Sequence, residues 1–337
     1  MAVNLSGVLQ NSLYNNPIDL YKHVVDHITD NHLTVSIDPE GWDLEYIGFY
    51  KFLDFVRQYL HPDLQVTIET SNIFQKHPPY VTLDYKTPGF IGNALSWWKP
   101  EYLQPKQIDK TFGLFVGRPD VPRLHFLSHL YSMYRDKSIL TANCKNFQIG
   151  SAMHQQEAET IASNPALYDL IKILPISGPN NETVDFSSSI RNPINIPLYQ
   201  RFFCEIVCET NFTQGFFPTE KIWRPILYKT PFIVVGAPGF INHLKALGFK
   251  TFDNYWNETY DDISPSPDAL PWSWLEQKFN NIENIISMLA CKNNAELQEM
   301  YDSMQDILDH NYNLITQNYP VHHIQGRLHD LSKSAKL

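Results

Sequence analysis

Helix and strand patterns alternate through the first hundred residues of the chain. A helix is predicted over residues 17–30, because four apolar side chains fall on one helical face: Ile18, Tyr21, Val25 and Ile28. The short β-rich run 33–37 predicts a buried strand, 44–59 a second helix, and 64–68 a second strand. Strands that alternate with helices in this way are typical of a parallel sheet.

A second alternating series follows a stretch that is rich in proline. Its expected strands are 111–116, 138–141, 201–208 and 231–235, and its expected helices are 121–134, 219–228, much of 270–310, and a last one after Pro320. The two series predict an α/β fold with two Rossmann-like, doubly wound domains that face a cleft.

Chain length supports two domains, because 337 residues exceed the size at which one hydrophobic core usually keeps growing. We place the linker over 99–110, which divides the chain into domains at 1–105 and 106–337. Ligands in doubly wound sheets bind at the carboxyl ends of strands, so the loops after those strands are where we look for chemistry.

The charge balance narrows the class of partner. Lys and Arg number 26 against 36 Asp and Glu, which gives a net charge of −10, and the basic residues form no run. A protein that binds a long nucleic acid generally needs a basic stripe. A large polyanionic partner is therefore disfavoured, whereas a local basic pocket for one diphosphate is compatible with the composition.

The sequence favours a cytoplasmic protein, of a cell or of an infected host cell. The N-terminus lacks a charged stretch followed by an apolar one, as a signal peptide would have. No run of eighteen apolar residues is present, so we expect no integral membrane segment. The four cysteines form no CxxC pair, which favours buried free thiols over a disulfide framework.

The segment 208–236 carries the strongest motif. It reads CETNFTQGFFPTEKIWRPILYKTPFIVVG, in which a strand and a polar loop precede a helix that opens at Thr219, Glu220 and Lys221. The start of a helix offers free N–H groups and a positive dipole, which suit a phosphate. Lys221 can neutralise a diphosphate, and Glu220 can accept hydrogen bonds from ribose hydroxyls. The alternative is an ordinary helix start with Glu in its first turn and an exposed Lys.

This motif resembles the donor motif of the α-fucosyltransferases. The similarity consists of Thr219-Glu220-Lys221-Ile222 and, nine residues later, the strand-like run Pro231 to Gly236. The resemblance implies a GT-B fold and an inverting transfer from GDP-fucose without a bound metal. It also implies that Glu220 and Lys221 hold ribose and diphosphate, and that Asn211 in the loop has a donor-side role. The family pattern differs at 216–218, so a nucleotide-sugar donor follows more directly than fucose itself.

Two arginines are further candidates for the diphosphate. A predicted strand ends at Gly117-Arg118, and Arg123 follows five residues later. Arg holds two phosphate oxygens with a planar fork and keeps its charge. The resembling family has an Arg near this point, and one sequence leaves open which of the two corresponds to it. A structural surface Arg is the alternative in each case.

The predicted catalytic base is Glu40, in the turn that follows the first predicted strand. An inverting transferase needs a base for the acceptor hydroxyl, and a carboxylate at a strand end is suitably positioned for that task. Asp38 and Glu69 are substitutes. The alternative is a turn that merely favours Asp, Pro and Gly.

Signatures of other chemistries are weak or missing in the sequence. Tyr260-Asp261-Asp262 lacks the Asp-x-Asp pattern after an apolar strand, so a solvated loop is favoured over a metal site. The patterns GxGxxG, GxxxxGK and GxSxG do not occur. We therefore predict no metal and no cofactor other than the donor nucleotide-sugar.

Together these features predict an inverting, metal-independent glycosyltransferase. Domain 1–105 would bind the acceptor, a glycan or other hydroxyl compound, and domain 106–337 would bind the nucleotide-sugar and include the terminal helices. One alternative is a transferase that acts on modified nucleic acid bases, against which the acidic charge argues. A second alternative is a non-catalytic glycan-binding module, against which the intact Glu220-Lys221 pair argues.

Overall fold

Contacts between residues divide the chain into two units, which are described here one at a time. The structure is a computed structural model that describes residues 2–5, 17–37, 44–45, 48–73, 76–86, 95, 98–117, 120–142, 159, 161–176, 196–264, 273–317 and 326–331. The first unit comprises Met1–Gly89, Thr210–Phe217 and His322–Leu337, and the second comprises Phe90–Glu209 and Pro218–Val321. The domain boundary expected after residue 105 stays a prediction.

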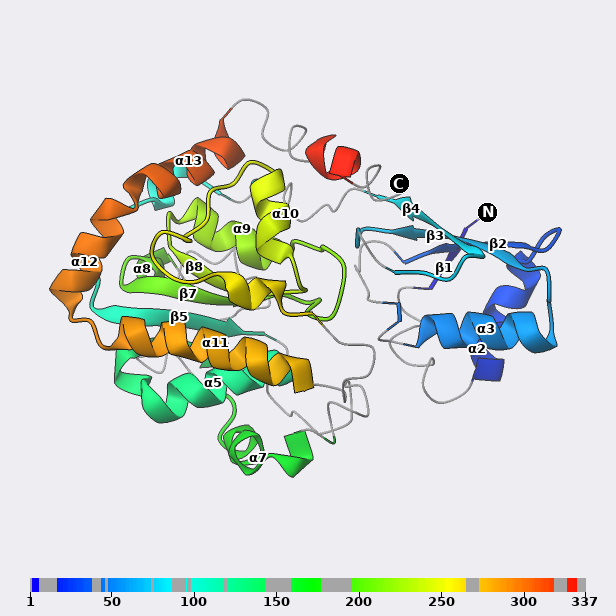
Figure 1. The fold of residues 1–337 in the computed structure, drawn as a ribbon, viewed down its shortest axis with the longest axis horizontal. Coiled ribbons are helices and arrows are strands. Elements are labelled where there is room, and N and C mark those ends of the chain that lie inside the picture. Colours follow the sequence, from blue (N-terminus) through cyan, green and yellow to red (C-terminus); the bar gives the residue numbers. More distant parts are fainter. Residues whose placement is uncertain are drawn as a thin grey trace. The chain divides into compact units, whose positions relative to one another are not determined.

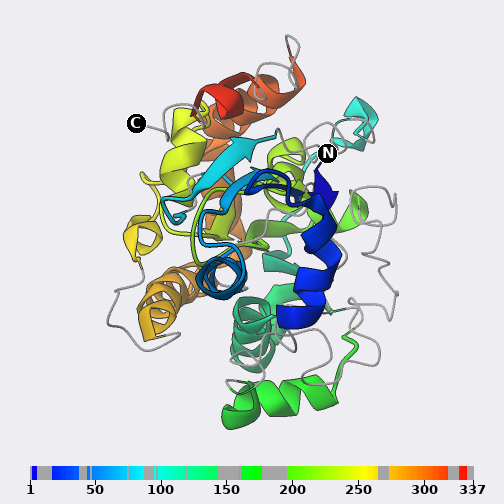
Figure 2. The ribbon, with the colours of Figure 1, turned by 90° about the vertical axis from the view of Figure 1, so that its right-hand side faces the viewer.

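The first unit contains a four-stranded parallel sheet whose order follows the chain, β1-β2-β3-β4 (Figure 1). The strands are β1 (Val3–Asn4), β2 (His32–Ser36), β3 (Gln65–Thr70) and β4 (Val81–Tyr85). The helices α2 (Pro17–Val24) and α3 (Phe49–Tyr59) accompany them. Figure 2 shows α3 end-on beside the strands. The strands predicted at 33–37 and 64–68 are confirmed, whereas the two edge strands were not predicted.

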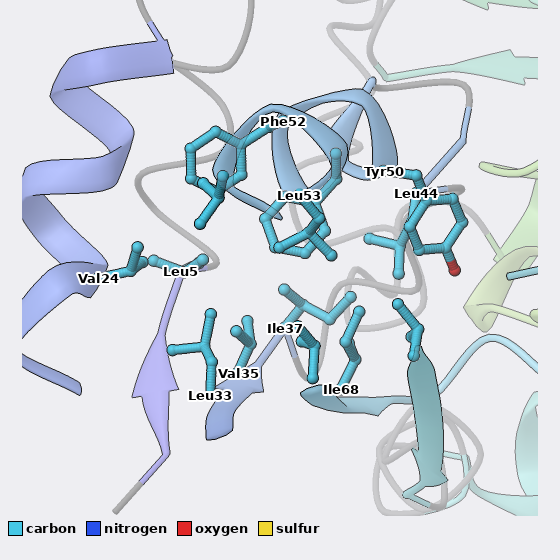
Figure 3. Close-up of a cluster of buried hydrophobic side chains, with 14 of the residues drawn as sticks. Leu5, Val24, Leu33, Val35, Ile37, Leu44, Tyr50, Phe52, Leu53 and Ile68 are labelled. Carbon is cyan, nitrogen blue, oxygen red and sulfur yellow. The ribbon is translucent and has the colours of Figure 1, made fainter. Parts of the chain in front are cut away.

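Every second residue of the central strands faces the helices in the first unit. Leu33, Val35 and Ile68 are at most 1% exposed, and they point towards Phe52 and Leu53 of α3 (Figure 3). The residues between them, such as Thr34 and Ser36, are half-buried. Burial of one such apolar side chain stabilises the fold by about 1.5–3 kcal/mol. The alternation therefore identifies one face of this sheet as the packed one.

The second unit contains another four-stranded parallel sheet, with the order β6-β5-β7-β8. Its strands are β5 (Lys110–Val116), β6 (Ser138–Ala142), β7 (Phe202–Cys208) and β8 (Phe232–Val235). The chain adds β6 on one side of β5 and then returns to add β7 on the other side. The order therefore reverses between β5 and β7. All four predicted strands of this region are confirmed.

Helices cover both faces of the second sheet (Figure 1). On one face lie α5 (Val121–Met133), α7 (Pro165–Lys172), which packs against α5, and α11 (Ser273–Ala290). On the other lie α9 (Glu220–Leu227), α10 (Phe240–Ala246) and α13 (Gln305–Thr316). Consequently every residue of β6, β7 and β8 is buried. This is the doubly wound arrangement predicted for the region, although α7 and α10 were not predicted.

The expected long helical region is divided into three helices. Between α11 and α13 lies α12 (Asn294–Ser303). Asn293 accepts hydrogen bonds from the backbone N–H groups of Ala295 and Glu296, and the Glu296 side chain accepts one from the N–H of Asn293. This reciprocal cap starts a new helix at Asn294.

Among the described residues, no helix is both long enough and apolar enough to cross a membrane.

Candidate functional site

The candidate site lies at the carboxyl edge of the second sheet, where the strand order reverses. β5 ends at Val116 and its neighbour β7 ends at Cys208. The connections that follow these two strands lead towards opposite faces, because β5 continues through α5 to β6 and β7 continues through α9 to β8. Such a switch point leaves a crevice between adjacent loops, and ligands of open α/β sheets bind there.

The helix α9 begins at this edge, as the sequence predicts. Thr219 is its N-cap, and the Thr219 hydroxyl accepts from the backbone N–H of Lys221. The Lys221 ammonium donates to the Thr219 Oγ1 over 3.0 Å and pairs with the Glu220 carboxylate over 3.1 Å. The Glu220 and Lys221 side chains keep 31% and 23% of their surface exposed, so a ligand can still reach both.

The carboxylate of Glu220 remains charged at neutral pH. Burial raises its pKa, but the charge of Lys221 and the hydrogen bond from Lys221 outweigh burial, so the pKa of Glu220 falls below its usual value. The helix start therefore presents one accepting carboxylate and one ammonium side by side. That pair can accept hydrogen bonds from hydroxyls and can contact an anion.

Glu209 belongs to the same cluster, although the sequence analysis did not single it out. It directly follows β7 and is 1% exposed. Its carboxylate accepts from both the hydroxyl and the backbone N–H of Thr219, the latter over 3.2 Å. Burial raises the pKa of Glu209, against the opposing charge of Lys221 and the bonds from Thr219. Glu209 thus fixes the N-cap residue that orients Lys221.

Arg123 ties α5 to the end of β7. It is 4% exposed and forms an ion pair of 2.8 Å with Asp120, the N-cap of α5. Its guanidinium also donates to the backbone carbonyls of Cys208, over 3.4 Å, and Glu209, over 3.3 Å. These contacts hold the start of α5 against the end of β7 at the switch point. The predicted contact of Arg123 with phosphate stays a prediction.

A buried ion pair connects α9 to the strand β7. Arg224 of α9 pairs with Glu205 in the middle of β7, and the two side chains are 5% and 0% exposed. The hydroxyl of Tyr199 donates to the second oxygen of Glu205 over 2.7 Å. Because both partners are removed from water, loss of either one would leave the other charge buried without its counter-charge.

The loop after β8 is fastened by Lys278 of α11. The fully buried ammonium donates to the carbonyl of Gly236 over 2.7 Å and lies 3.6 Å from the carboxylate of Asp261. Asp261 also accepts from the backbone N–H of Ile241 over 2.7 Å. Asp261, which the sequence places in a possible metal cluster, thus helps to fix this loop. Within the described ranges, no group of three or more His, Cys, Asp or Glu residues is arranged to hold a metal ion.

The structure assembles four of the predicted site residues in one region. Arg123, Thr219, Glu220 and Lys221 are linked through the end of β7, as described above. Two other candidates, Glu40 and Arg118, lie outside the described residues, as does Asp38. Glu69, a proposed substitute for Glu40, lies on β3 and pairs with Lys86 over 3.3 Å.

Asn211 belongs to the first unit, in the segment Thr210–Phe217, and is 8% exposed. Phe216 of this segment exchanges two backbone hydrogen bonds with Ile73, of 2.7 and 3.3 Å. Gly215 has a φ of +81° and lies so close to Asn72 that a Cβ there would approach the side-chain oxygen to 2.2 Å. A residue with a side chain would therefore disrupt this packing. Sequence reasoning gave no sign that the segment packs in this way.

No family model matches the chain, and neither a curated protein nor a solved structure matches it.

Proposed function

We propose that the chain is an inverting, metal-independent glycosyltransferase that takes its sugar from a nucleotide-sugar. The observation that carries this proposal is the cluster of Glu209, Thr219, Glu220 and Lys221 at the switch point of the second sheet. It combines a helix start, an accessible ammonium and an accessible carboxylate within one small region. These groups complement the diphosphate and the ribose of such a donor.

In this proposal the charge of Lys221 and the positive end of α9 stabilise the leaving diphosphate. As the bond between the anomeric carbon and the phosphate oxygen breaks, that oxygen takes the electron pair and gains negative charge. Fixed positive groups aimed at this charge lower the barrier. The new bond forms between the anomeric carbon and the acceptor oxygen, whose proton passes to a base, for which Glu40 is the candidate.

The remaining candidates have supporting roles in the proposal. Glu220 accepts hydrogen bonds from the ribose hydroxyls, Arg118 contacts the diphosphate, and Asn211 acts on the donor side. GDP-fucose is the finer proposal for the donor, and it rests on the resemblance of 219–222 and 231–236 to the α-fucosyltransferases. The two-domain GT-B fold rests on the same resemblance, and two parallel sheets with helices are compatible with it.

Calorimetric titration with GDP, UDP and ADP tests the donor site. We expect one of them to bind, and we expect Lys221→Ala to weaken that binding about 10- to 100-fold, since a charge-assisted hydrogen bond contributes roughly 1.5–3 kcal/mol. Lys172→Ala, which removes an exposed lysine of α7, is the matched control and should leave the affinity unchanged. Equal affinities of Lys221→Ala and the wild-type chain would refute the donor site.

Transfer assays distinguish the proposed enzyme from the two alternatives. With the matching nucleotide-sugar and a panel of glycan acceptors, we expect a glycosylated product with inverted anomeric configuration. Nucleotide binding without any transfer would favour a non-catalytic module. Transfer to DNA that falls steeply with salt would favour the nucleic acid alternative, because phosphate contacts are strongly salt-dependent.

A further inference from the structure

A cavity of about 700 Å³ lies at the amino edge of the second sheet, opposite to the candidate donor site. Its lining comes from the residues before β5, from those before β7, and from the first turns of α12. Each of these two strands has seven residues, which spans about 20 Å. The cavity is therefore a separate place in the unit, and its volume is that of a typical small-molecule site.

The charged groups of this cavity already have partners. The ammonium of Lys106 donates to the backbone carbonyls of Tyr199, over 2.9 Å, and Phe202, over 2.7 Å. Arg201 forms a two-pronged ion pair with Asp109, at 2.6 Å for the shortest contact. Burial also lowers the pKa of Lys106 to about 7, which weakens its positive charge. An anion would therefore find no uncommitted cation among the described residues that line the cavity.

The start of α12 offers little to an anion either. The backbone N–H groups of Ala295 and Glu296 both donate to the Asn293 side chain, over 2.9 and 3.1 Å. These groups would have to give up the cap before they could bind a phosphate or carboxylate. The cavity is consequently unsuited to the nucleotide that we propose for the opposite edge.

Three side-chain amides of the cavity, in contrast, make no hydrogen bond with another described residue, and a ligand in the cavity can reach them. They belong to Gln107 and Asn294, which are exposed, and to Gln200, which is half-buried. Each amide offers two donors and one acceptor, the combination that satisfies a hydroxyl group, which both donates and accepts. Apolar surface from Ile108 and Pro197 completes the lining. A neutral ligand with several hydroxyls and a C–H face matches this set of groups.

We propose that this cavity is a saccharide-binding site, which holds a neutral pyranose residue of a glycan away from the candidate donor edge. Gln107, Gln200 and Asn294 hydrogen-bond its hydroxyls. Such a site would keep a glycan chain bound to the protein through one sugar residue while another residue of the same chain is not bound in this cavity. The proposal rests on the cavity alone and does not require the proposed transferase activity.

Saturation-transfer NMR with the full chain tests the site. The probes are the methyl glycosides of glucose, galactose, mannose, fucose and N-acetylglucosamine. We expect at least one to receive saturation, and we expect Gln200→Ala/Asn294→Ala to weaken its binding about fivefold or more, since each lost hydrogen bond contributes roughly 0.5–1.5 kcal/mol. The matched control Gln277→Ala/Asn280→Ala removes two exposed amides of α11 and should retain the wild-type signal.

Two outcomes would overturn the proposal. The first is that none of the five glycosides receives saturation from the wild-type chain. The second is a signal that survives in Gln200→Ala/Asn294→Ala but disappears in Lys221→Ala or with saturating nucleoside diphosphate, which would assign the sugar to the donor edge. Loss of nucleotide binding alone would count against the proposed function and would leave this site unaffected.

Discussion

The two sheets have the same number of strands, all of them parallel, yet they differ in strand order and in burial. In the first unit the order β1-β2-β3-β4 follows the chain, and buried residues alternate with half-buried ones. In the second unit the order reverses between β5 and β7, and β7 is buried at all seven positions. The polar cluster of Glu209, Thr219 and Lys221 lies at this reversal, where the connections after β5 and β7 lead to opposite faces of the sheet.

Among the substitutions that test this difference between the two units, we expect the largest loss of stability at the buried ion pair of the second unit. Arg224→Leu leaves the carboxylate of Glu205 buried without its partner. We expect the free energy of unfolding to fall by about 3–5 kcal/mol, as measured by denaturant titration. Lys172→Ala, at an exposed ion pair in the same unit, is the control and should change little. A small effect of Arg224→Leu would mean that the pair is not firmly buried.

Alanine substitutions on consecutive strand residues test the difference in burial directly. Ile206→Ala and Val207→Ala remove neighbouring side chains of β7 that point to opposite faces, and both are 1% exposed. We expect each to lower the unfolding free energy by about 2 kcal/mol or more. In β2 buried residues alternate with half-buried ones, so Val35→Ala should be costly and Ser36→Ala much less so. If Ser36→Ala were as costly as Val35→Ala, the second face of the first sheet would also be packed.

Glu209→Gln tests the position of the N-cap residue in the candidate site. The hydroxyl of Thr219 donates to Glu209 and accepts from both the backbone N–H and the ammonium of Lys221. An amide in place of the carboxylate must direct its NH₂ group at one of the two donors of Thr219. We expect a loss of about 1–3 kcal/mol in stability together with weaker nucleotide binding, both measured by thermal shift. Glu209→Gln with unchanged stability and binding would contradict this arrangement.

We expect the smallest of these effects from the titration of His243 of α10, which makes the stability of the protein depend on pH. Burial lowers the pKa of His243 to about 4, below its value of 6.5 in the unfolded chain. Between these pH values the unfolded chain binds more protons than the folded chain. The contribution of His243 to the free energy of unfolding is therefore complete above pH 6.5 and declines as the pH falls towards 4. His243 is partly exposed, so we expect a loss of about 1–2 kcal/mol, smaller than full burial would give.

Urea titrations at pH 7 and pH 4.5 measure this loss, and His243→Gln is the variant for comparison. Because glutamine does not titrate, the difference in unfolding free energy between the two pH values should shrink in the variant. An identical pH dependence in both chains would show that His243 does not contribute to it.

The sequence predicts much of the fold but little of the strand order. The strands β5 to β8 are recognisable because each is mostly apolar, and β2 and β3 because apolar residues alternate with polar ones. β1 has only two residues, and β4 carries Asp84 and follows two prolines, so neither has a strong pattern. The reversal between β5 and β7 depends on pairing between residues about ninety positions apart, such as Phe112 and Cys204, which no local pattern reports.

The candidate site was predictable only in part for a similar reason. Thr219, Glu220 and Lys221 stand out because capping and first-turn preferences are local. Glu209 was missed because a single Glu after an apolar strand has no distinctive local context. Its partner Thr219 lies ten residues away, across a loop. A search for acidic residues at the carboxyl ends of buried strands would have found it.

The segment Thr210–Phe217 has a consequence for how this protein can be divided into pieces. The chain passes between the two units at residues 89–90, 209–210, 217–218 and 321–322, so no single cut separates them. A fragment that starts at residue 90 would carry 210–217 without Asn72 and Ile73, the residues that it packs against. Expression of the second unit by itself would thus require a short polar replacement for this loop, joined between Glu209 and Pro218.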